Sequence, residues 1–141
     1  MSGFTYGARS TAHLNTCHPD LRRVAKTALV VSPIDITIVC GLRQQRAQDE
    51  AFAMGLSRKR WPDSRHNGVA PDYDESTALD FAPWINGTIH WNDTGSFYVV
   101  AGIFLAAAGW EGVKVRYGGD WDRDGLTRDQ SFMDLGHLEL A

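Results

Sequence analysis

The sequence predicts an α+β domain in which about three helices pack on one face of a small, mostly antiparallel sheet. Two segments repeat apolar residues at the spacing of a helix, and a third segment is compatible with a helix. Four shorter segments predict strands, three of them by alternation of residues between two faces. The chain has 141 residues, 43% hydrophobic and 22% charged, which suits a globular domain that buries its own core. We therefore expect a single domain over residues 1–141.

The three predicted helices have recognisable starts and stops. The first covers residues 19–32, with a proline in its first turn, and the second covers residues 44–54, followed by a glycine stop. The third begins after a capping Asn92 or Asp93 and ends at Gly109. Its apolar stripe, which we interpret as core, consists of Phe97, Val100, Ala101, Phe104, Leu105 and Ala108.

Four strands complete the predicted fold. They cover residues 34–40, 77–82, 113–117 and 136–140. Residues 56–76 contain two prolines and several charges, show no periodicity, and predict a long loop. Loops of this length in compact domains are usually functional or disordered.

The last predicted strand brings together two groups that can transfer protons or bind a metal. Leu138 and Leu140 fall on one face of the strand. His137 and Glu139 fall on the other, so the imidazole points away from the core. Asp134 lies three positions before His137, and a glycine between them lets the backbone turn. A carboxylate and an imidazole can therefore meet at one strand end, unless this is simply an exposed terminal strand.

Further polar residues fall at strand ends or in the adjoining loops. Asp80 lies in the middle of a predicted core strand, where a carboxylate needs an explanation. His66, Asp80 and His137 would make a three-ligand zinc set with the fourth position left for water. Asp134 could then accept the proton of that water, and Arg43 could steady an oxyanion.

Charge and composition limit the partners. The net charge is −3, and the one concentration of basic residues is either a solvated loop or, beside His66, a recognition site for an anionic substrate. This basic cluster consists of Arg58, Lys59, Arg60 and Arg65. We expect no nucleic-acid partner.

We also expect no membrane insertion and a cytoplasmic product, because membrane-spanning and signal segments are missing. Cys17 and Cys40 are expected to be free, with no redox or metal role.

An acidic loop before the last strand partly matches a calcium-binding loop of the EF-hand type. The candidate calcium ligands are Asp120, Asp122, Asp124 and Asp129. Gly125 stands where the sharp turn is needed, but position 12 is Ser131 rather than a bidentate glutamate. A solvated acidic loop and a weak calcium site that orders the approach to Asp134 both remain open.

Several short motifs occur in an order that resembles a known family. They are Ser64-x-His66, Ala78-Leu79-Asp80-Phe81-Ala82-Pro83, Gly118-Gly119-Asp120-Trp121 and Asp134-x-x-His137-x-Glu139-Leu140. The chain resembles the zinc L-alanyl-D-glutamate endopeptidases of phage lysis systems over nearly its whole length. That family belongs with the D-alanyl-D-alanine carboxypeptidases and shares its fold with the Hedgehog signalling domain.

The resemblance implies a function and a role for each site residue. His66, Asp80 and His137 would bind zinc, Asp134 would be the general base, and Arg43 would contact the substrate or the oxyanion. The chain would be an endolysin, an expected monomer that waits in the host cytoplasm and cuts peptidoglycan stem peptides once the membrane is permeabilised. A D-alanyl-D-alanine carboxypeptidase is one alternative, and a non-catalytic zinc-containing binding module on the same fold is the other.

One departure from the family pattern concerns the carboxylate ligand. The family usually has the first histidine and the aspartate closer together than His66 and Asp80 are here. Asp72 nearly restores the usual spacing and is therefore a competing ligand. We predict Asp80, because the segment after it continues the family pattern and residues 67–76 have the character of an insertion.

Overall fold

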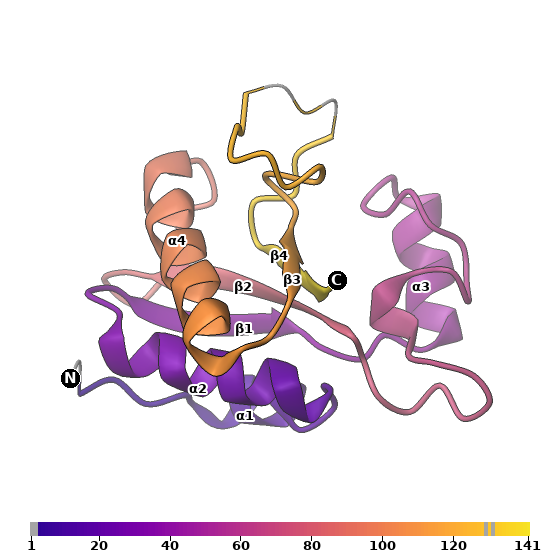
Figure 1. The fold of residues 1–141 in the computed structure, drawn as a ribbon. Helices are drawn as coiled ribbons and strands as arrows, with labels where there is room; N and C mark the ends of the chain where they lie inside the picture. The colour runs from indigo at the N-terminus through magenta and orange to yellow at the C-terminus, as the bar shows by residue number, and fades with distance from the viewer. Residues whose placement is uncertain (1–2, 129, 131) are drawn as a thin grey trace.

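The computed structural model describes residues 3–128, 130 and 132–141, and it contains a four-stranded antiparallel sheet (Figure 1). The strands lie in the order β1-β2-β4-β3. Their bounds are β1 (Asp35–Cys40), β2 (Ala78–Trp84), β3 (Val115–Tyr117) and β4 (His137–Leu140). The predicted α+β class is confirmed, and each predicted strand is present.

Four α-helices and one short 3-10 helix accompany the sheet in the described residues. They are α1 (Ala8–Leu14), α2 (Pro19–Val31), α3 (Gln45–Ala53), η1 (Arg65–Asn67) and α4 (Thr94–Glu111). The structure has one α-helix more than the roughly three expected; α1 was not anticipated because it has only two buried residues, Ser10 and Leu14, and so shows no apolar stripe. Ser10 Oγ accepts a hydrogen bond of 2.9 Å from Ile38 N, which joins α1 to β1.

The helix α4 is longer than predicted. It continues past Gly109 to Glu111 and ends at Gly112, whose left-handed backbone (φ 70°) makes a suitable C-terminal cap. Leu105, which we expected in the core, is 40% exposed, while the rest of the predicted stripe is buried. Although α4 has 18 residues, no helix of the described part is both long and apolar enough to cross a membrane.

The core lies between the sheet and the pair α2 and α4, which pack against each other. Phe81 of β2 stacks on Phe104 of α4 with ring centroids 4.6 Å apart. By contrast, α3 stands to one side of the other helices (Figure 1) and buries only Gln48, a polar residue. The apolar core thus lies on the side of α2 and α4, whereas α3 and its loops flank the end of β1 and the beginning of β2.

Candidate metal centre

Three elements that are distant in sequence place His66, Asp80 and His137 side by side. Asp80 and His137 are direct partners across the antiparallel pair β2 and β4. His66 belongs to η1, whose first turn is capped by the Ser64 side chain. Arg43 N donates to His66 O at 2.8 Å, which fixes η1 against the chain that leaves β1. The structure thus brings together the three residues that the sequence predicts as zinc ligands.

The distances among the three side chains fit one tetrahedral metal ion. Asp80 Oδ1 lies 3.1 Å from His137 Nδ1 and 3.2 Å from His66 Nε2, and the two nitrogens are 3.3 Å apart. Zinc bonds of about 2.0–2.2 Å to nitrogen and oxygen place neighbouring tetrahedral ligands roughly 3.3–3.6 Å apart. The triangle is therefore close to the size that zinc ligation requires.

The outer partners of both histidines leave a lone pair turned towards the centre. His66 Nδ1 lies 2.8 Å from Gly41 O, a carbonyl that can only accept, so Nδ1 donates and Nε2 of the neutral ring carries the lone pair. His137 Nε2 lies 2.8 Å from Glu139 Oε1 and donates in the same way, which leaves Nδ1 as the acceptor. With Asp80, three acceptor atoms converge, and they need a cation between them.

The electrostatics of the centre also favour positive charge. Burial would lower the pKa of His66, but the charge of Asp80 and the hydrogen bond to it raise this pKa to about 10, so a proton on His66 competes with a metal ion for the lone pair of Nε2. Burial would raise the pKa of Asp80, but His66 and His137 hold it well below its usual range. The site therefore keeps Asp80 ionised and ready to bind a cation.

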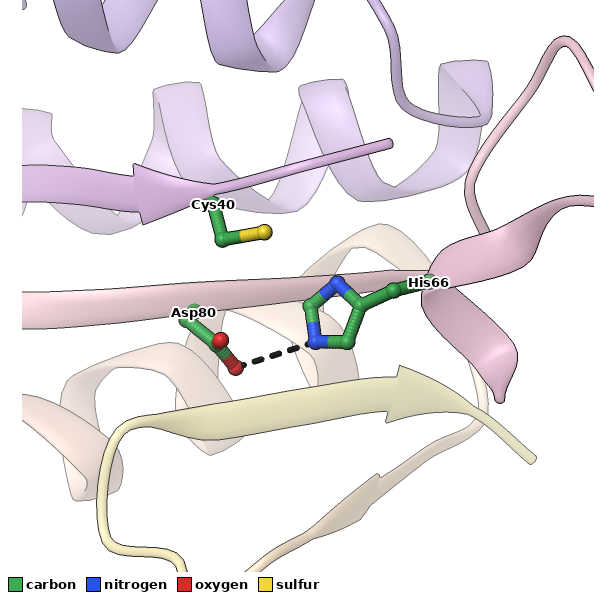
Figure 2. Close-up of side chains that lie close together, drawn as sticks. All are labelled: Cys40, His66 and Asp80. Carbon is green, nitrogen blue, oxygen red and sulfur yellow. Dashed lines mark hydrogen bonds and ion pairs between the residues drawn. The ribbon is translucent and has the colours of Figure 1, made fainter. Parts of the chain in front are cut away.

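Cys40 lies near the same centre. The side chains of Cys40, His66 and Asp80 lie close together (Figure 2), and their ligand atoms are all within 4.8 Å of one another. The sulfur also accepts a hydrogen bond of 3.8 Å from Arg43 Nη2. Cys40 is a free thiol, to which we had assigned no metal role. A cation held by Cys40, His66 and Asp80 is thus a second grouping, but the mutual contacts of 3.1–3.3 Å favour the set with two histidines.

Asp134 stands beside the centre without joining the close triangle. Its Oδ2 is 3.9 Å from His137 Nδ1, and its side chain is 42% exposed towards the cleft. Burial and the charge of Asp80 raise the pKa of Asp134, which strengthens it as a proton acceptor. Gly118 makes this position possible, because a Cβ at Gly118 would collide with Asp134 O.

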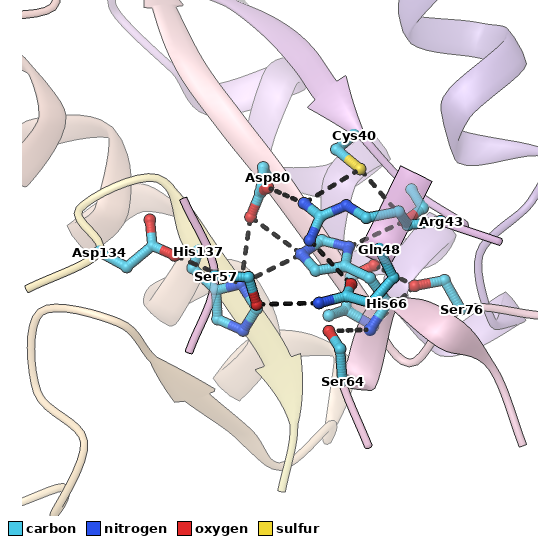
Figure 3. A network of polar contacts seen from close by, with 12 residues as sticks. Cys40, Arg43, Gln48, Ser57, Ser64, His66, Ser76, Asp80, Asp134 and His137 are labelled. Carbon is cyan, nitrogen blue, oxygen red and sulfur yellow. Dashed lines mark hydrogen bonds and ion pairs between the residues drawn. The ribbon is translucent and has the colours of Figure 1, made fainter. Parts of the chain in front are cut away.

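Arg43 belongs to a buried polar network on the other side of the centre (Figure 3). Its Nη1 donates to Gln48 Oε1 at 3.0 Å, and its Nη2 lies 3.8 Å from Asp80 Oδ2. Gln48, fully buried, donates through Nε2 to Lys59 O at 2.6 Å. Asn67 Nδ2 donates to Gln48 Oε1 and to Arg43 O. The network therefore ties α3 and its following loop to Asp80.

The centre opens into a cleft of about 620 Å³. Trp121 forms part of one wall, with its ring 5.5 Å from the His137 ring and its Nε1 donating to Phe132 O at 2.7 Å. The Phe132 ring stacks on Trp121 with the ring centroids 6.3 Å apart, and the Arg58 guanidinium lies 4.1 Å from the centre of the Phe132 ring. The cleft can hold a small ligand or a short peptide segment against the metal centre.

The competing ligand Asp72 lies away from this cleft. It is exposed and does not belong to the described residues that line the cleft. Thr77 N donates to Arg65 O at 3.1 Å, so the two ends of the intervening loop meet beside His66. Residues 67–76 therefore form an excursion whose ends are close, which is how His66 reaches Asp80 despite their separation in sequence.

The predicted calcium loop gathers three of its four candidates. Asp120, Asp122 and Asp124 each place an oxygen within 4.8 Å of the others, and Asp122 and Asp124 are exposed. The Asp120 oxygens already accept hydrogen bonds from Asp124 N and Gly125 N. Asp129 lies outside the described residues. The loop is thus an acidic turn held by hydrogen bonds from its own backbone to the Asp120 carboxylate, and the structure adds no support for calcium.

Sequence reasoning gave no role to Glu139 and Gln48. Glu139 is 4% exposed, holds His137 Nε2 and pairs with Arg116 Nη2 at 2.8 Å. Alternation had placed it on the same face as His137, and a carboxylate next to a candidate metal-binding histidine is the signal that could have identified it. For Gln48 no signal existed, because a glutamine on an amphipathic helix normally faces solvent.

A sheet that presents one histidine and a carboxylate beside a second histidine from η1, with another carboxylate in the same cleft, has the arrangement of a metal-dependent hydrolase. The family described as phage L-alanyl-D-glutamate peptidase matches the chain over residues 1–141. The chain belongs to that family, as the resemblance predicted.

Two relatives illustrate how close the match is. The L-alanyl-D-glutamate peptidase of Escherichia phage T5 is 39% identical over 141 residues, which cover 98% of both chains. The crystal structure of the Serratia marcescens L-Ala D-Glu endopeptidase ChiX aligns with a TM-score of 0.74 at 28% identity. That alignment covers 97% of this chain and 90% of the other.

Proposed function

We propose that the chain is an endolysin that hydrolyses the L-alanyl-D-glutamate bond in peptidoglycan stem peptides. The observation that carries the proposal is the triangle of His66, Asp80 and His137 at the bottom of a cleft, with Asp134 beside it. Family membership and the names of both relatives support this bond as the target. Peptidoglycan is accordingly the partner.

Zinc is the metal that the donor set fits best. Catalytic zinc is typically bound by three protein ligands at three corners of a tetrahedron, with the fourth corner open to the substrate. Here two imidazoles and one carboxylate would fill the three corners, and the fourth would face the cleft. When bound, zinc would supply a Lewis acid that lowers the pKa of a water molecule and polarises the scissile carbonyl. Gly41 O and Glu139 hold the two rings in the tautomers that ligation needs.

Asp134 and Arg43 carry the other proposed roles. Asp134 accepts a proton from the attacking water, because its carboxylate is reachable from the cleft and its pKa is raised. It can then return the proton to the leaving amine of D-glutamate. Arg43 orients Asp80 through their ion pair, and as a cation that lines the cleft it can also stabilise the oxyanion.

Digestion of purified peptidoglycan followed by mass spectrometry of the fragments tests this proposal. We expect new carboxyl termini at L-alanine and new amino termini at D-glutamate. Release of terminal D-alanine instead would show the alternative D-alanyl-D-alanine carboxypeptidase. Intact stem peptides, from protein that contains its metal, would show a binding module without catalysis.

The setting of the reaction follows from the proposed substrate. We propose that the protein acts as a monomer, is held in the host cytoplasm until lysis, and reaches the cell wall after the membrane is permeabilised.

Calcium binding to Asp120, Asp122 and Asp124 stays a prediction of the sequence. Calcium titration of the zinc-loaded protein tests it, and activation that is lost in Asp122→Ala would establish the site.

A further inference from the structure

The cleft carries an excess of positive charge although the whole chain has a net charge of −3. The cations that line it are Arg43, Arg58, Lys59, Arg65 and Arg116. The carboxylates that line it are Asp63, Asp80, Asp134 and Glu139. A divalent metal would increase the excess. A cleft with this charge attracts an anionic group of a ligand.

Two of these cations share one carboxylate next to the metal centre. Arg116 Nη2 lies 2.8 Å and Arg65 Nε lies 3.6 Å from the same atom, Glu139 Oε2. The other oxygen of Glu139 accepts the hydrogen bond from His137. Two guanidiniums therefore face a single carboxylate, so one positive charge remains unneutralised on the His137 side of the cleft.

The backbone holds both arginines in place while their side chains stay accessible. Arg116 of β3 is the direct cross-strand partner of Glu139 in β4. Arg65 immediately precedes His66 in η1. Their side chains are 39% and 54% exposed, respectively. Each guanidinium has five N–H donors, and the contact with Glu139 uses one nitrogen of each, so both can also donate to a ligand.

From this arrangement we infer that Arg65 and Arg116 bind the α-carboxylate of the D-glutamate residue whose amide bond is cut, an inference that rests on the proposed function. In the stem peptide this glutamate continues through its γ-carboxyl group, so its α-carboxylate remains free. It lies on the carbon attached to the scissile nitrogen, close to the metal centre. Arginine donates to carboxylates with two parallel hydrogen bonds, which makes the pair a specificity element.

A pair of synthetic peptides tests the inference. In both peptides L-alanine is joined to the amino group of D-glutamate, and the chain continues from the γ-carboxyl group of that glutamate. One peptide carries a free α-carboxylate, and the other carries an α-carboxamide. For the wild-type protein we expect kcat/KM to be about 10- to 100-fold lower for the carboxamide, the size of a lost charge-assisted contact. In Arg65→Gln and Arg116→Gln, kcat/KM should fall more for the carboxylate peptide than for the carboxamide peptide, so the preference shrinks.

The preference ratio separates recognition from structural damage. Loss of metal or of folded protein lowers cleavage of both peptides equally, and the two variants are made separately so that either one suffices. Arg46→Gln is the control, because Arg46 is 94% exposed on α3, pairs with Glu50 and does not line this cleft. It should keep the full preference.

Two results would overturn this inference and leave the proposed function standing. They are equal cleavage of both peptides by the wild type, or an unchanged preference in both variants. If the metal-loaded wild type cleaves neither peptide, the proposed function itself fails and the inference fails with it.

Discussion

Asp80 Oδ1 lies 3.1 Å from His137 Nδ1, and the two residues are direct partners across β2 and β4. The proposed metal centre is thus built into the hydrogen-bonded register of the sheet, and only His66 comes from outside it. A register shift of one residue would turn Asp80 or His137 to the opposite face. The sheet therefore holds two of the proposed ligand positions in place, which is what a preorganised metal site requires.

Asp134→Asn should separate metal binding from catalysis. The amide keeps nearly the same shape but cannot accept the proton of the attacking water, so we expect kcat to fall by about 10²–10⁴-fold. Zinc content and melting temperature should stay near the wild-type values, because Asp134 is outside the close triangle. Wild-type turnover in this variant would remove Asp134 from the mechanism.

Glu139→Gln should weaken metal binding without touching the metal. The neutral amide is a poorer partner for His137 Nε2, and loss of such outer partners typically costs about 10- to 100-fold in metal affinity. Competition with a chromophoric zinc chelator measures the change. Glu50→Gln is the matched control, since Glu50 lies on α3 with a 63% exposed side chain. Equal zinc affinity in the two variants would show that Glu139 has no such role.

Gly118→Ala should disturb the turn that carries Asp134. The new methyl group would overlap Asp134 O, so we expect a loss of about 1–3 kcal/mol in the free energy of unfolding and reduced turnover. In Gly102→Ala, on α4, the added Cβ has no neighbour within 4 Å, and alanine favours a helix. Urea unfolding of both variants checks the contrast, and equal stability would refute the packing argument.

Removal of the metal should affect both activity and stability. A chelator is expected to abolish hydrolysis and to lower the melting temperature, because metal binding stabilises the fold that brings the ligands together. Added zinc should restore both. Full activity after exhaustive chelation would be incompatible with a metal-dependent reaction.

Much of this site could be predicted from the sequence because its residues stand at the ends of strongly patterned elements. Alternation in β4 placed His137 on the polar face, and Asp80 stood out as a carboxylate inside an apolar strand. The short helix α1 was missed because it buries a serine where a periodic apolar residue would be expected. The roles of Gln48 and Cys40 depend on tertiary contacts between α3, η1 and β1, which no local pattern encodes.

Metal stoichiometry tests the central claim, the ligand set, most directly. Purified variants are equilibrated with zinc, freed of excess metal and measured by inductively coupled plasma mass spectrometry. We predict one zinc per chain for the wild type and for Asp72→Ala, and loss of most zinc in His66→Ala and Asp80→Ala. One zinc per chain at wild-type affinity in Asp80→Ala, together with loss in Asp72→Ala, would contradict the account.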